Sequence, residues 1–355
     1  MHVCCRRPSS GGDPCHTAGM NQVGGPVICA DGRTEQERQS LYRRERGGEF
    51  LRIAPGHFIE TISHGDLDAE EQVLVRIAAF ACCAPASVAV GRTAARLWEL
   101  PILPPADHGT WRVELGRIGG RTRRTRHVHY RHLSAGHRDH IETTDCGFGT
   151  VRVTGVLATA LDLARWSSLA DAVRVLDHCL REDLFTHEEM ERRAGEMHRL
   201  QGAAQVGQAV ALATASSESP RESEVKVLLR ELGAPVPWQQ ATIRDQRGRE
   251  IGRVDFFWPE LGLIIEFDGD VKYSLLDPGD NSIRLREYAQ TLEYLRNGLI
   301  PIRFSSADLA SGLAAATIAA HLTGGAAQGR PYPDHLWSAE TPAWTGHNGG
   351  HALRP

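Results

Sequence analysis

Hydrophobic positions in the first part of the chain recur either at helical spacing or with the period of two that is typical of strands. A polar helix ending at Gly47-Gly48 precedes a hairpin around Pro55-Gly56, and strand-like runs then separate several amphipathic helices. The helices expected here span 34–46, 69–83, 88–100, 156–166, 170–184, 187–199 and 201–213. The strands expected here span 50–60, 111–118, 126–133 and 150–155. We therefore predict an α+β half over residues 34–215, with a mixed α/β part at 69–213.

A small and polar stretch at 214–220 marks the main predicted domain boundary, and the pattern changes after it. The helices expected in the second part span 219–232, 282–297 and 307–321. The strands expected there span 236–243, 251–258, 261–267 and 300–304. This order predicts an α/β domain over 216–323. Residues 1–33 and 324–355 show no period, so we expect the first segment to be disordered and the second to be a flexible tail.

The composition excludes several classes of protein. The chain has 355 residues, of which 41% are hydrophobic, so it can form real cores and is not disordered throughout. It contains no apolar run of the roughly 18 residues that a transmembrane helix needs, and its start has no apolar core of a secretory signal. Its cysteines are scattered without a CxxC motif, which favours a reduced, cytoplasmic protein. The net charge of -4 excludes a uniformly basic nucleic-acid coat but not a local basic patch.

Three carboxylates carry the strongest chemical signal. Glu266 and Asp268 lie two apart at the end of an apolar strand, so they point to one face. A two-residue turn at Pro259-Glu260 would place Asp255 opposite Ile264, on the same face. Such oxygen ligands suit Mg²⁺, which could activate water for phosphodiester hydrolysis. The alternative is that Glu266, Asp268 and Asp270 are only the polar end of a strand that enters a turn at Gly269.

Lysine is rare in this chain, because all basic residues except Lys226 and Lys272 are arginines. Lys272 follows the three carboxylates within reach, and its compact amine could stabilise developing negative charge. Lys226 falls in the helix at 219–232, where we expect it to lie on the helix surface without a special role.

The segments SPRESEVKVLLRELG, VDFFWPELGLIIEFDGDVKY, IRLREY and GLIPIRFSSADL resemble the very-short-patch-repair-endonuclease-like family of the PD-(D/E)xK nuclease superfamily. The family is common as a C-terminal domain in actinobacterial proteins, and the resemblance covers about 217–310. It implies a restriction-endonuclease-like mixed sheet flanked by helices. The residues that it implies in catalysis or metal binding are Asp255, Glu266, Asp268, Lys272 and Glu222. It also offers Arg284 and Arg286 as phosphate contacts.

Two positions depart from the family pattern. Asp268 occupies the usual lysine position of the ExK motif, so Lys272 would have to substitute from the next segment. The helix that carries Arg284 and Arg286 is about one turn longer than is usual. Glu222 has a second explanation, because Ser219-Pro220-Arg221-Glu222 forms a good capping box at the start of a helix.

A basic segment runs from Arg117 to Arg138 without an acidic residue. It suits contacts to nucleic-acid phosphates, or alternatively it is a solvated edge strand protected by charge. The arginines that we assign to nucleic-acid binding are Arg121, Arg123, Arg124 and Arg126. Tyr130 is the only aromatic residue among them, so stacking on single strands is not expected. We interpret the histidines of this segment as surface residues, since their spacing matches no standard zinc site.

The motifs GGEFLRIAPGHFIE, VGRTAARLWELPIL, VTGVLATALDLARW and AVRVLDHCLREDLFT together resemble the antitoxin or regulator of type IV (abortive-infection, AbiEi-type) toxin–antitoxin systems. The resemblance covers about 40–215 and implies a winged helix-turn-helix, of which 34–62 would be a partial copy. The hairpin would be the wing, and the polar helix would be the recognition helix, with Arg43, Arg44 and Arg46 contacting DNA. A cognate toxin would then be a partner.

Two hypotheses follow for the whole chain. In the first, a DNA-interacting protein carries a Mg²⁺-dependent endonuclease-like domain. In the second, the protein is a non-catalytic transcriptional regulator or antitoxin, and its nuclease-like fold only holds DNA or a partner. The sequence leaves open whether the protein is an enzyme, and under both hypotheses it acts in the cytoplasm on DNA and not at a membrane.

Overall fold

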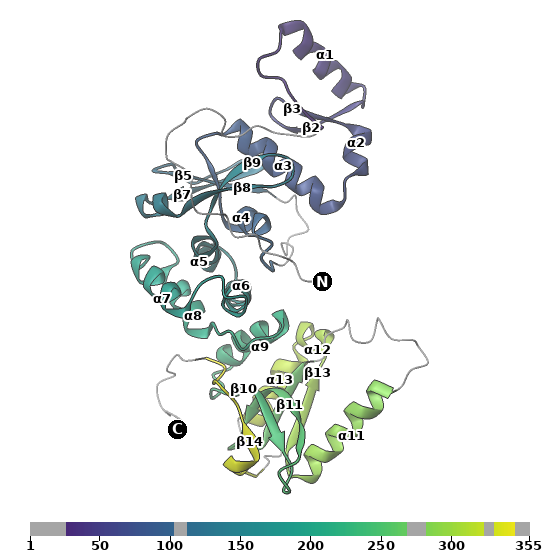
Figure 1. Cartoon of the computed structure of the whole chain (residues 1–355), viewed down its shortest axis with the longest axis vertical. Coiled ribbons are helices and arrows are strands. Elements are labelled where there is room, and N and C mark those ends of the chain that lie inside the picture. The colour runs from purple at the N-terminus through teal and green to yellow at the C-terminus, as the bar shows by residue number, and fades with distance from the viewer. Residues whose placement is uncertain (1–25, 103–111, 268–281, 323–329, 345–355) are drawn as a thin grey trace. The chain divides into compact units, whose positions relative to one another are not determined.

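A computed structural model describes residues 26–102, 112–267, 282–322 and 330–344 (Figure 1). The chain forms two compact units. The first contains the described parts of 1–89 and 112–154, and the second contains the described parts of 90–111 and 155–355. The predicted boundary at 214–220 thus falls inside the second unit. None of the described helices is both long and apolar enough to span a membrane.

The first unit contains a small sheet of order β1-β3-β2 and a mixed sheet of order β6-β7-β5-β4-β9-β8. Its helices are α1 (Glu35–Arg46), α2 (Thr61–Asp66), α3 (Ala69–Cys83) and the short 3-10 helix η1 (Ala135–His140). Its strands are β1 (Val27–Cys29), β2 (Phe50–Ala54), β3 (His57–Glu60), β4 (Val88–Ala89), β5 (Val113–Ile118), β6 (Arg123–Arg124), β7 (Val128–Leu133), β8 (Ile141–Asp145) and β9 (Thr150–Thr154).

Local sequence explains the two main helices of this unit. Thr34 begins α1 and Asp68 begins α3, and each closes a capping box with the glutamate three residues later, Glu37 and Glu71. Residues 30–49, between β1 and β2, hold one helix, α1. The hairpin of β2 and β3 lies within residues 50–60, as predicted. The winged helix-turn-helix as a whole stays a prediction.

The second unit combines helices with a five-stranded sheet of order β13-β12-β11-β10-β14, in which only β12 and β13 run parallel (Figure 1). Its helices are α4 (Gly91–Leu97), α5 (Val156–Trp166), α6 (Leu169–Arg181), α7 (His187–Glu196), α8 (Ala203–Leu212), α9 (Pro220–Glu231), α11 (Ser282–Arg296), α12 (Ser306–Ala310), α13 (Leu313–Leu322) and the 3-10 helix η2 (Asp334–Leu336). Its strands are β10 (Trp238–Arg244), β11 (Glu250–Trp258), β12 (Leu263–Phe267), β13 (Ile300–Phe304) and β14 (Trp337–Ser338).

The sheet of the second unit is buried on both faces, which explains the apolar runs of its central strands. Phe256 and Ile265 belong to a large core that also contains residues of α5, α6, α8 and α9. Phe257 and Ile264 belong to a second core with Tyr294 of α11. The predicted α/β class is therefore confirmed, with a mixed sheet between helices, while the restriction-endonuclease-like fold itself stays a prediction.

A glycine lets α11 approach this sheet. A Cβ atom at Gly252 of β11 would lie 2.0 Å from Nε2 of Gln290 and 2.8 Å from the hydroxyl of Tyr294. Real Cβ atoms do not approach other heavy atoms so closely. Any side chain at this position would therefore displace the ends of the Gln290 and Tyr294 side chains from the strand that carries Asp255.

Three sequence-based predictions are wrong in their details. The segment 26–33 is not disordered, because Val27–Cys29 pairs with β3. The helix predicted over 88–100 begins only at Gly91, after the short strand β4. The helix predicted over 307–321 is two helices, because the chain turns at Ser311-Gly312, where Gly312 has a φ of 78°.

The expected flexible tail is also wrong for residues 330–344. Strand β14 extends the sheet by pairing with β10, and Tyr332, Leu336 and Trp344 are buried. The hydroxyl of Tyr332 donates to the carbonyl oxygen of Arg244. The polar and glycine-rich composition of the tail concealed these aromatic anchors.

Candidate functional site

Two of the predicted carboxylates come together at one end of the central strand pair of the second unit. Phe256 of β11 pairs with Ile265 of β12, so the next residues along the two strands, Asp255 and Glu266, lie beside each other on one face. The connecting turn is longer than predicted, since Trp258 pairs with Leu263 across residues 259–262. Asp255 thus faces Glu266 instead of Ile264. This shift of two residues keeps the predicted face.

Glu222 reaches the same place from α9. Its side chain is 4% exposed, and its Oε2 atom accepts hydrogen bonds from Nε2 of Gln240 at 2.9 Å and from Nε2 of Gln239 at 3.2 Å. The predicted helix start is confirmed, with Ser219 as the N-cap and Pro220 in the first turn. The predicted capping box is not, because the Glu222 carboxylate accepts from the amide of Glu218. Glu222 therefore belongs to the carboxylate cluster.

Gln240 connects Glu222 to Asp255, a role that no sequence pattern indicated. Its Nε2 atom also lies 3.5 Å from Oδ1 of Asp255. Its φ is +54°, which is rare for a residue other than glycine and costs on the order of 1–2 kcal/mol in a non-glycine residue. A strained residue in a strand is retained only where its surroundings fix it. Here the strain coincides with the meeting point of the carboxylates.

Burial and neighbouring negative charges perturb Asp255. Burial, together with the nearby Glu222 and Glu266, raises the pKa of Asp255 to about 7 against the hydrogen bond from the Phe267 amide. That amide donates to Oδ2 of Asp255 at 2.8 Å. A carboxyl group of this kind is close to half protonated near neutral pH, and it would be stabilised in its charged form by a cation.

Glu266 also has a positively charged neighbour. A terminal nitrogen of Arg303, on β13, lies 2.7 Å from its Oε2 atom. The same guanidinium group contacts Gln290 at 2.9 Å and lies 3.7 Å from Glu287, both on α11. Arg303 therefore already neutralises part of the negative charge that would otherwise attract a metal ion.

Not all predicted members of the site belong to the described residues. Asp268 and Lys272 fall in 268–281, outside them. Among the residues that the structure does describe, no three His, Cys, Asp or Glu side chains are arranged closely enough to hold a metal ion. Glu222, Asp255 and Glu266 are thus neighbouring carboxylates with oxygen donors of the type that Mg²⁺ prefers, but the three are not arranged together as metal ligands.

The predicted nucleic-acid contacts lie in several different places. Arg43 and Arg46 are exposed on α1, whereas Arg44 pairs with Glu49 at 2.8 Å and lies over the ring of Phe50. Arg121, Arg123, Arg124 and Arg126 are all exposed in and around β6. Arg286 is exposed on α11, and the side chain of Arg284 lies outside the described set.

The expectation of surface histidines is wrong at two positions of the basic segment. His129 and His137 are 6% and 1% exposed. His129 lies 3.4 Å from Glu114, and His137 contacts the hydroxyl of Ser134 at 3.0 Å. Both histidines therefore belong to the interior of the first unit, where they contact polar side chains.

The expectation for Lys226 is also wrong. Its side chain is completely buried, and its Nζ atom donates to Oδ1 of Asp177 at 2.9 Å and to the carbonyl oxygen of Leu212 at 2.8 Å. The carboxylate of Asp177 also accepts from Ser223 and from the amide of Thr214. This network joins α6 to α9, the helix that carries Glu222.

Comparison with known proteins adds relatives but no activity. No protein-family model matches the chain. The chain is similar to two proteins of Mycobacterium tuberculosis, from strains CDC 1551 and H37Rv, each described as an uncharacterized protein. The identity is 30% over 176 residues, which is 48% of this chain and 64% of each relative. The chain therefore spans less than two thirds of the length of these relatives.

Proposed function

We propose that the second unit is a Mg²⁺-dependent endonuclease-like domain that hydrolyses DNA phosphodiesters. The observation that supports this most strongly is the convergence of Asp255, Glu266 and Glu222 from two strands and a helix, with Gln240 between them. Surface carboxylates repel one another and separate, so acids that are held together inside a protein need a reason other than solubility.

In this function, Asp255 and Glu266 would hold the metal ion together with Asp268, whose position the described residues do not include. The chemistry that the ion would supply is polarisation of the DNA phosphate and activation of a water molecule. The Gln240 amide orients the carboxylate of Glu222, and the Phe267 amide fixes one oxygen of Asp255, leaving its other oxygen toward Gln240. Lys272 would stabilise negative charge on the phosphate.

The test is nicking of supercoiled duplex DNA by the full chain, with Mg²⁺ and with EDTA. Asp255→Asn and Glu222→Gln should each reduce the rate by at least about a hundredfold, as expected when a group acting on the transition state is removed. Glu250→Gln is the matched control, because Glu250 is an exposed carboxylate on the same strand, β11. Cleavage by Asp255→Asn at the rate of the unsubstituted protein would exclude this site.

The second candidate is a regulator or antitoxin that binds DNA without cutting it. The pairing of Arg303 with Glu266 favours this function, since a carboxylate held by a guanidinium group is a poorer metal ligand. The exposed Arg43 and Arg46 of α1 would then contact DNA as part of a winged helix, and a toxin would be the partner. Tight binding of duplex DNA in EDTA, with no cleavage after Mg²⁺ is added, would support it.

A further inference from the structure

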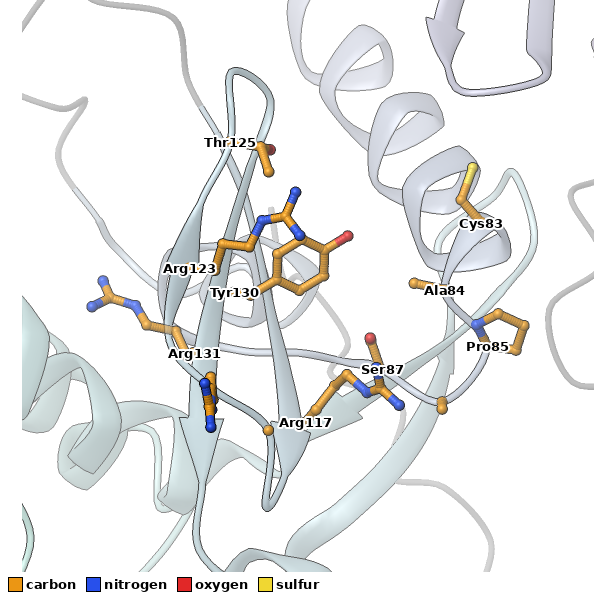
Figure 2. A pocket seen from close by; sticks show the side chains of 12 residues that line it. Cys83, Ala84, Pro85, Ser87, Arg117, Arg123, Thr125, Tyr130 and Arg131 are labelled. Carbon is orange, nitrogen blue, oxygen red and sulfur yellow. The ribbon is translucent and has the colours of Figure 1, made fainter.

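The first unit contains a hollow of about 550 Å³ beside the C-terminal end of α3 (Figure 2). Cys83, the last residue of α3, and Ser87, in the loop that follows, line one side of it. Strands β5, β6 and β7 and their connections line the other side, with Arg117, Arg121 and Arg123. No aspartate or glutamate is among the described residues that line it. The hollow is therefore strongly positive.

Strand pairing places the charged groups on one face. Arg123 pairs with Tyr130, and Tyr130 pairs with Leu115 of β5. Paired residues share a face, and so do residues two apart, which puts Arg117 on the side of Arg123 and Tyr130. Gly120 keeps the turn after β5 tight, because a Cβ there would lie 2.8 Å from the Cβ of Arg117.

Three of the four arginines that line the hollow have side chains without a partner among the described residues. The guanidinium groups of Arg117, Arg121 and Arg123 form no hydrogen bond or ion pair with any described residue. Arg131 differs, since its guanidinium group is held by Glu114, and in Figure 2 its side chain points away from Tyr130. Guanidinium groups that gather without a carboxylate repel one another, and an external anion would remove that repulsion.

We propose that this hollow binds a nucleotide unit, through its phosphate at Arg117, Arg121 and Arg123 and through its base against Tyr130. Planar guanidinium forks match the oxygens of a phosphate, and the hydroxyl of Ser87 adds a neutral donor. A single aromatic residue does not predict stacking along a whole strand, but the partly exposed ring of Tyr130 offers a face on which one base can stack. The site belongs to the first unit and does not depend on the hydrolysis proposed for the second.

Other features of the hollow agree with this ligand. Cys83 is an exposed residue, but partial burial of its thiol, together with Cys82, Cys29 and Asp31, raises the thiol pKa to about 12, so this group adds no negative charge that would repel a phosphate. The carboxylates of an acidic peptide would also pair with the arginines, but they have no aromatic ring that could stack on Tyr130. The same nucleotide chemistry can come from a free nucleotide or from one residue of a nucleic-acid strand.

The experiment is fluorescence polarisation of a labelled single-stranded oligodeoxynucleotide with the full chain in EDTA, where metal-dependent cleavage cannot contribute. Arg117→Gln, Arg121→Gln and Arg123→Gln are combined in one variant. The matched control combines Arg33→Gln, Arg112→Gln and Arg138→Gln, which remove the same charge from exposed arginines of the same unit that do not line the hollow. Circular dichroism checks that both variants fold.

The hollow variant should bind more than about tenfold more weakly, because it loses charge-assisted hydrogen bonds. The slope of log affinity against log salt should fall by about 2, at about 0.7 for each lost phosphate contact. The control should change affinity by less than about threefold, since its arginines do not line the hollow and a general loss of surface charge acts weakly at physiological salt. Equal losses in the two variants, or no loss in the hollow variant, would overturn the proposal.

Two further probes test the base and distinguish the sources. An abasic strand keeps the phosphates but has no base, so it should bind more weakly than the normal strand; equal binding would refute the contact with Tyr130. Adenosine monophosphate that displaces the strand shows that a free nucleotide enters the hollow. Binding of the strand without such displacement assigns the hollow to nucleic acid.

Discussion

Replacement of Lys226 by methionine should strongly destabilise the second unit. The substitution keeps most of the side-chain volume but removes the charge. It leaves the buried carboxylate of Asp177 with the hydroxyl of Ser223 and the amide of Thr214 but without a cation. The carbonyl oxygen of Leu212 loses its donor as well.

The structure sets the size of this effect. Asp177 is 1% exposed and Lys226 is 0% exposed, so water cannot replace the lost partner. Removing one member of a buried ion pair typically costs about 3–5 kcal/mol in the free energy of unfolding. In a unit of this size, each kcal/mol lowers the melting temperature by about 2–4 °C. We therefore expect a decrease of roughly 6–20 °C.

Thermal and urea unfolding, followed by circular dichroism, measure this effect. Arg221→Met is the matched control, because Arg221 lies on the same helix and its ion pair with Glu224 is partly exposed, with an expected cost below about 1 kcal/mol. In a double-mutant cycle, Asp177→Leu should cost less in the Lys226→Met background than alone. If Lys226→Met costs no more than Arg221→Met, the buried pair is not a main support of the fold.

Three shorter predictions concern the site and the tail. The folded-state pKa of Asp255 is raised to about 7 from its ordinary value of 3.8. The charged carboxylate therefore lowers the free energy of unfolding above pH 7, and this loss of stability disappears as the pH falls toward 3.8. Asp255→Asn should therefore raise the melting temperature in EDTA at pH 8 more than at pH 5, and a pH-independent difference would contradict the assignment. Gln240→Ala should be less stable to urea than Gln240→Gly by about 1 kcal/mol, because only glycine adopts the observed φ without strain; the reverse order would speak against it. Leu336→Ala should cost about 2–5 kcal/mol by thermal unfolding, whereas a truly flexible tail would show no change.

Local patterns allowed much of the site to be predicted. The alternation of β11 and the apolar run of β12 placed Asp255 and Glu266 on one face, even though the turn between them was predicted too short. A face depends only on whether the register shift is even or odd, so an error of two residues was harmless. The start of α9 at Ser219 and Pro220 could be predicted equally well, because helix capping depends on residues that are close together in the sequence.

Contacts between distant parts of the sequence could not be predicted in this way. Lys226 stands between Val225 and Val227 in the sequence, but no residue near it in the sequence indicates its ion pair with Asp177, which lies on another helix. The positive φ of Gln240 follows from its place between Glu222 and Asp255, and a glutamine in a strand gives no sign of it. In the tail, the aromatic residues were the available signal, and the glycine-rich composition outweighed them.

The shared core of α5, α6, α8, α9 and the sheet limits how this gene can be shuffled in evolution. A recombination break within codons 214–220 would give one product an unpaired buried Asp177 and the other an unpaired buried Lys226. Both products would also expose the apolar residues that now cover each other. A break near residue 154 would spare this ion pair, but it would still separate Ala95 and Leu100 from the core that they share with the rest of the second unit. Inherited exchange of modules should therefore keep the sheet of the second unit together with the helices that precede it.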